Sequence, residues 1–85
     1  MKNAKKKDYS AEDVTMMLIQ FCQSHGLLNS HCNLSTIEYY RHRKNEAIEY
    51  LGFVINDYGT EKDMKIFASM FGMSTKKAHK LLTAR

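Results

Sequence analysis

The stretch Phe67–Leu82, FASMFGMSTKKAHKLL, contains the clearest structural signal of this 85-residue chain. Its apolar residues follow helical spacing on both sides of Gly72. Glycine adopts a positive φ without strain and commonly follows the end of a helix. Ser74 comes two residues later and can cap a new helix. The stretch therefore predicts two short helices, about 61–71 and 75–83, that are joined by a tight turn.

Residues 64–83 also fit the twenty-residue template of a known motif. The template requires a small residue fifth and a glycine ninth, where this chain has Ala68 and Gly72. A larger side chain at 68 would push the second helix away, and residue 72 must turn with a positive φ. The apolar positions of the template hold Phe67, Phe71, Met73, Ala78 and Leu81. The stretch thus resembles a helix-turn-helix DNA-binding motif, and an ordinary helical hairpin with a glycine corner is the alternative interpretation.

The resemblance implies that the second helix enters the major groove of double-stranded DNA. Its outward positions are all polar or basic, and they are Ser74, Thr75, Lys76, Lys77, His79, Lys80 and Thr83. Four of them are the candidates for contacts with base edges: Thr75, Lys76, His79 and Lys80. We expect Ser74 and Lys77 to hold phosphate instead. Thr60 and Lys62, at the start of the preceding helix, are placed to meet the DNA backbone.

The distribution of charge agrees with a polyanionic partner. The net charge is +4, and residues 74–85 hold four basic and no acidic residues. Residues 1–9 hold four lysines and one aspartate, whereas 10–73 holds five basic and eight acidic residues. Basic ends on a near-neutral body suggest binding to DNA, with 1–9 as a basic arm. The alternative is that these lysines only confer solubility.

The whole chain is predicted to be all-α, with a flexible tail at 1–9 and a single helical domain at 10–85. It has no proline and four glycines, as a helical chain should. We expect four helices, at about 11–25, 36–58, 61–71 and 75–83. Three of them begin with a capping pair, in which an acidic residue follows the cap by three positions: Ser10 and Asp13, Ser35 and Glu38, Thr60 and Asp63.

The predicted 36–58 helix is the candidate interface of a homodimer. One helix-turn-helix has little contact area, and such regulators usually bind palindromic DNA as dimers. The helix carries four tyrosines, Tyr39, Tyr40, Tyr50 and Tyr58. The alternative is that these tyrosines cover the core of the monomer.

Both cysteines and two of the four histidines lie in the segment CQSHGLLNSHC, residues 22–32. Cys22, His25, His31 and Cys32 have the right atoms for zinc. However, adjacent side chains such as those of His31 and Cys32 usually diverge, and Cys22 belongs to the apolar stripe of the first helix. We therefore expect no metal, and we interpret the segment as a loop between helices whose leucines pack under the core.

The sequence favours a small DNA-binding transcriptional regulator of bacterial or phage type. No phosphate-binding glycine loop or catalytic pair is evident, so we expect neither an enzyme nor a cofactor. No apolar run is long enough to span a membrane and no secretory signal is evident, so we expect a cytoplasmic protein. The alternative function is a small protein-binding inhibitor or antirepressor that does not bind DNA.

Overall fold

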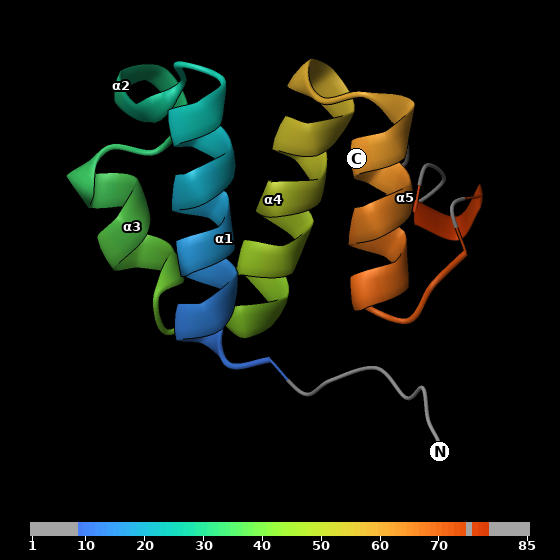
Figure 1. The fold of residues 1–85 in the computed structure, drawn as a ribbon. Helices are drawn as coiled ribbons and strands as arrows, with labels where there is room; N and C mark the ends of the chain where they lie inside the picture. The colour runs from blue at the N-terminus through green and yellow to red at the C-terminus, as the bar shows by residue number, and fades with distance from the viewer. Residues whose placement is uncertain (1–8, 75, 79–85) are drawn as a thin grey trace.

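The structure is a computed structural model that describes residues 9–74 and 76–78, and within them all regular structure is helical. The helices are α1 (Ala11–Ser24), α2 (Leu28–His31), α3 (Leu34–Tyr40), α4 (Lys44–Tyr58) and α5 (Glu61–Met70), and residues 76–78 are also helical. Figure 1 shows α1, α4 and α5 side by side with α4 in the middle, and α2 and α3 on the far side of α1. The predicted all-α class is confirmed.

Two of the predicted capping boxes are present. In α1, the Ser10 hydroxyl accepts the backbone N–H of Asp13, and the Asp13 carboxylate accepts the N–H of Ser10, both at 3.1 Å. In α5, Thr60 and Asp63 form the same pair at 2.9 and 3.2 Å. Each pair satisfies two backbone donors that a helix start leaves free. These caps fix where the first and last of the labelled helices begin.

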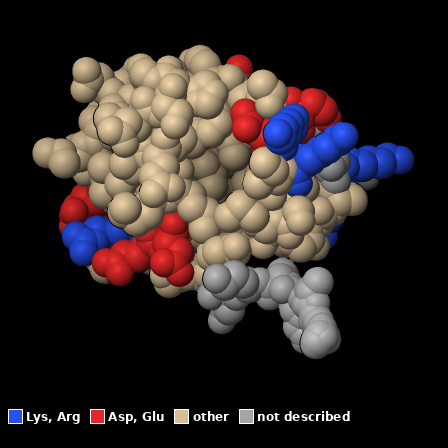
Figure 2. Space-filling model, in the orientation of Figure 1, with Lys and Arg blue, Asp and Glu red and all other residues tan. Residues whose placement is uncertain are grey.

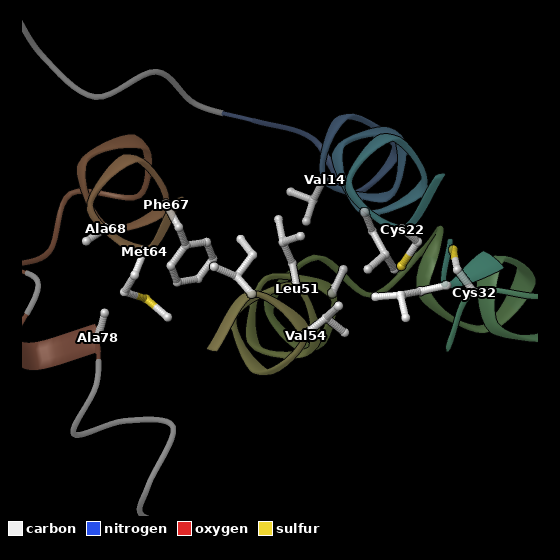
Figure 3. Packing of buried hydrophobic residues seen from close by; sticks show 13 residues of the cluster. Val14, Cys22, Cys32, Leu51, Val54, Met64, Phe67, Ala68 and Ala78 are labelled. Atoms are coloured by element: carbon white, nitrogen blue, oxygen red, sulfur yellow. The ribbon is translucent and has the colours of Figure 1, made fainter. Parts of the chain in front are cut away.

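The core lies on both sides of α4, between α1 and α5. The largest fully buried side chains are Phe67, Leu18, Met64, Val14 and Cys22. Figure 3 shows Val14 and Cys22 of α1 on one side of Leu51 and Val54, and Phe67 and Met64 of α5 on the other. Because α4 contacts both neighbours, it holds α5 at a fixed place relative to α1.

The prediction of one helix at 36–58 is wrong, because residues 41–43 break it into α3 and α4. The rings of Tyr40 and Tyr50 stack with centroids 4.9 Å apart and an interplanar angle of 13°. In a continuous helix these residues would lie about 15 Å apart along the axis. The break therefore folds α3 back against α4, and this stacking is one contact that it permits.

The predicted cap of this region is also wrong. The N-cap of α3 is Asn33, whose side-chain oxygen accepts the Thr36 N–H at 3.0 Å, and Ser35 lies inside the helix. Leu34, the first residue of α3, is 83% exposed. The predicted loop before it contains the single turn α2, although Leu27 is buried as expected.

Candidate nucleic-acid interface

The turn after α5 has the geometry that was predicted at Gly72. Gly72 has a φ of 71°, in the left-handed region. Its N–H donates to the carbonyl of Ser69 at 3.3 Å, and the N–H of Met73 donates to the carbonyl of Ala68 at 2.9 Å. This pair of bonds is a Schellman motif, in which a glycine reverses the chain at the helix end. The motif ends α5 at Met70 and sends the chain into the next helical segment within a few residues.

Ser74 caps this next segment, as predicted. Its hydroxyl accepts the N–H of Lys77 at 3.0 Å, and its carbonyl accepts the N–H of Ala78 at 3.0 Å. Residues 76–78 are helical. Thr75, His79, Lys80, Leu81 and Thr83, which the sequence assigns to the same helix, lie outside the described residues. The start of the segment is therefore defined by one side-chain cap and one backbone bond.

The inner side of this corner is built from small and apolar residues. Ala68 is 1% exposed and Ala78 is fully buried. Figure 3 shows Ala78 pointing toward Met64 and Ala68 of α5. A bulkier side chain at either alanine would separate the two segments, because protein cores tolerate little added volume. The predicted need for a small residue at 68 is in accord with this packing.

Phe67, Phe71 and Met73, the other described apolar positions of the motif, pack on the same core. Phe67 is 2% exposed, and Phe71 and Met73 are partly buried against it. The Phe67 and Phe71 rings have centroids 5.2 Å apart, and Tyr9 packs on Phe71 at 5.4 Å. From the sequence, Tyr9 belongs to the predicted tail, because no local pattern predicts its contact with Phe71, 62 positions further along the chain. It connects the start of the described chain to the turn.

The outer side of the corner is exposed and basic. Lys76 and Lys77 are exposed, as are Ser74, Thr60 and Lys62. The sequence reasoning missed Lys65, which is exposed one helical turn after Lys62; this spacing was the available signal. Figure 2 shows basic side chains gathered at the α5 end of the molecule beside a group of acids. The described part of this surface therefore has both signs of charge, with its lysines projecting outward.

The cysteines and histidines of residues 22–32 do not converge on one point. Cys22 and Cys32 are buried, 0% and 2% exposed, and both are free thiols. Burial raises the pKa of the Cys22 thiol to about 11 and also raises the pKa of Cys32. Among residues 9–74 and 76–78, no three His, Cys, Asp or Glu side chains are grouped as metal ligands would be.

The two histidines of that segment have partners elsewhere. The His25 ring stacks on Phe21 at 4.1 Å, and its Nδ1 donates to the Phe21 carbonyl at 3.1 Å. The His31 ring meets the edge of Tyr58 at 4.9 Å, and its Nδ1 lies 2.7 Å from the Ser30 hydroxyl. The segment therefore provides packing and turn contacts around two buried thiols.

The four tyrosines of the predicted dimer surface fall into two pairs, one packed on the core of the monomer and one exposed. Tyr40 and Tyr50 are half-buried against the core, and the Tyr50 hydroxyl donates to the His31 carbonyl at 2.6 Å. Tyr39 and Tyr58 are 51% and 45% exposed. Two of the four tyrosines thus belong to the monomer, and two face outward.

The chain matches no protein-family model, and no curated protein or solved structure is significantly similar to it. No helix among the described residues is both long and apolar enough to cross a membrane.

Proposed function

We propose that this protein is a small DNA-binding transcriptional regulator that uses the corner formed by α5 and the segment after Gly72. The observation that carries the proposal is the division of this corner into a buried side, Ala68 and Ala78, and an exposed side, Lys76 and Lys77. A helix that enters the major groove needs this division, because its inner side must hold it to the domain while its outer side remains free.

In this proposal the residues keep the roles that the motif implies. Ser74 and Lys77 bind phosphate at the start of the second helix, and Thr60 and Lys62 contact the DNA backbone from the start of α5. Lys76 reads base edges together with Thr75, His79 and Lys80. The Ser74 hydroxyl is already occupied by the Lys77 N–H, so its own contact with phosphate would use its hydroxyl hydrogen.

Binding to DNA is tested by fluorescence anisotropy on a labelled duplex of random sequence, measured between 50 and 200 mM salt, roughly the range over which phosphate contacts lose most of their strength. We expect affinity to fall steeply with salt. Lys77→Ala should weaken binding equally for all sequences and reduce the salt slope by about 1. The matched control is Lys44→Ala, which removes a lysine from the first turn of α4. A slope that is flat in the wild type, or altered equally by both variants, would refute the proposal.

Recognition of a specific DNA sequence by the protein requires a second experiment. Selection of bound duplexes from a random pool should return a preferred site, and Lys80→Ala should weaken binding to that site by about 1–3 kcal/mol. A selection that returns no preferred site would contradict the assignment of base contacts.

We further propose that the protein acts as a homodimer through the exposed side of α3 and α4. Leu34 is 83% exposed and Tyr39 is 51% exposed on α3, so that apolar atoms face solvent there. Sedimentation equilibrium should show a dimer that Leu34→Asp dissociates. A wild-type monomer at all concentrations would remove this part of the proposal and leave DNA binding to be judged alone.

The same exposed residues support the second candidate function, a protein-binding inhibitor or antirepressor. Exposed apolar side chains on a short surface helix are typical of contacts with another protein. Indifference to DNA together with a partner whose binding Leu34→Asp abolishes would favour this function over the first.

A further inference from the structure

A groove of about 140 Å³ lies between α1, α4 and α5. Its lining comes from one face of each helix, and on α5 this face is Asp63, Ile66, Phe67 and Met70, at positions i, i+3, i+4 and i+7. An apolar protein cavity of roughly this volume, about 150 Å³, accommodates one benzene ring. The groove is thus about the size of a single six-membered ring.

The composition of the lining defines the chemistry of an occupant. Eight of the nine lining residues are apolar, and three of them are the phenylalanines Phe21, Phe67 and Phe71. The ninth is Asp63, so the groove has one acidic residue and no basic one. Aromatic faces attract cations. A carboxylate beside apolar walls attracts a cation more strongly than one in open water, because less water screens its charge.

Asp63 lines the groove, and the capping box fixes the position of its carboxylate. In the capping box its Oδ2 accepts the Thr60 N–H at 2.9 Å, which holds the carboxylate in place. The other oxygen, Oδ1, has no part in that bond. We propose that the groove binds a small aromatic ammonium compound, with the ring among the phenylalanines and the ammonium against Asp63. This site does not depend on DNA binding and stands whether or not the chain is a regulator.

The test is an NMR titration of the ¹⁵N-labelled 85-residue chain with three probes of similar size: benzylamine, which is cationic at pH 7, benzyl alcohol and benzoate. We expect amide shifts in α1 and α5 with each probe that binds, and an affinity for benzylamine about fivefold higher than for benzyl alcohol, as a partly exposed ion pair supplies. Benzoate should bind least. Equal affinities for benzylamine and benzoate, or no shift at millimolar benzylamine, would overturn the proposal.

Two variants separate the carboxylate from the apolar walls. Asp63→Asn keeps an oxygen for the Thr60 N–H and removes the charge, so it should abolish the preference for benzylamine over benzyl alcohol. Ile66→Trp should block all probes, because its ring would cover the opening of the groove; Ile66 is 50% exposed and lies outside the buried core, so the larger side chain should not prevent folding. Its control is Met16→Trp, at a 54% exposed position outside the groove, which should leave binding unchanged. Retention of the preference in Asp63→Asn would refute the role of the charge, and this result does not require Ile66→Trp to fold.

Discussion

Replacement of Gly72 by alanine tests the turn on which the proposed DNA contact depends, and the chain contains its own matched control. Gly26 has a φ of 69° against 71° for Gly72. Gly26 also follows a helix, as Gly72 does. Its N–H donates to the carbonyl of Gln23 at 3.4 Å, and the N–H of Leu27 donates to the carbonyl of Cys22 at 2.7 Å. Both glycines therefore occupy the left-handed position of a Schellman motif.

The expected cost follows from this backbone conformation. An L-residue in the left-handed region costs roughly 1–2 kcal/mol, and alanine returns about 0.4–1 kcal/mol by restricting the unfolded chain. We therefore expect Gly26→Ala and Gly72→Ala each to lose about 1 kcal/mol of unfolding free energy. A Cβ at Gly26 would meet no atom within 4 Å, so its cost is conformational alone. Asparagine tolerates the left-handed region, and Gly→Asn should lose about half as much.

Unfolding is measured by circular dichroism in urea and on heating. A loss of 1 kcal/mol should lower Tm by about 4–8 °C in a domain of this size. A domain of 85 residues has an unfolding free energy of about 4–13 kcal/mol, so all four variants remain folded at 25 °C. Alanine and asparagine variants of equal stability at Gly26 would refute the conformational argument, because only the left-handed region distinguishes them there.

DNA affinity separates the two turns. The Gly72 turn directs the segment that carries Lys76 and Lys77, whereas the Gly26 turn lies between α1 and α2. We expect only Gly72→Ala to weaken DNA binding in the folded state, although both variants lose similar stability. If Gly26→Ala weakens binding as much, the effect follows stability and the corner has no special part in it.

Three further predictions concern the scaffold. Burial raises the pKa of Cys22 from 9.0 to about 11, so its neutral form stabilises the folded state. That stabilisation is complete below pH 9 and is lost as the pH rises through 11, up to about 3 kcal/mol. Urea titrations should show a smaller loss in Cys22→Ala. Tyr50→Phe removes the hydrogen bond to the His31 carbonyl and should cost about 1 kcal/mol in urea unfolding, whereas Tyr39→Phe at an exposed ring should cost nothing measurable. Thr60→Ala removes the α5 cap and should lower Tm by the equivalent of about 1 kcal/mol, and Thr60→Ser should restore most of it.

Features that depend on a few neighbouring residues were predictable from the sequence. The capping boxes at Ser10 and Thr60, the cap at Ser74 and the positive φ of Gly72 are each encoded within four residues. Their physical basis is local, because a serine or threonine hydroxyl reaches only the N–H groups of the next turn. The same holds for the small residue at Ala68, which the turn places beside the next segment.

The break at residues 41–43 was not predictable by such signals, because it contains neither glycine nor proline. Local propensity permits a helix there. The break follows from tertiary contacts: Tyr40 stacks on Tyr50, and Arg41 pairs with Glu12 at 3.7 Å and with Glu38 at 3.5 Å. The pair with Glu12 joins α3 to the start of α1, so it exists only once the chain has folded back.

The two cysteines show that spacing alone does not identify a metal site. Cys22 and His25 lie three apart on a helix, a spacing that suits a metal, yet Cys22 faces the core and His25 faces Phe21. Spacing gives the relative direction of two side chains and says nothing about which of them the core will bury. In this fold both thiols are buried in the core, and His25 and His31 pack against aromatic rings instead of lying beside the thiols.

The proposed DNA contact and the proposed ligand groove use different faces of α5. Met64 and Ala68 face Ala78, whereas Asp63, Ile66 and Met70 line the groove toward α1. Phe67 and Phe71 belong to the groove and are also in ring contact with each other at the turn. A ring bound in the groove would therefore act on the turn through these two phenylalanines. If both proposals hold, benzylamine should change the DNA affinity of the wild type and leave that of Ile66→Trp unchanged, as anisotropy would show. An equal change in both proteins would mean that benzylamine acts on DNA binding from outside the groove.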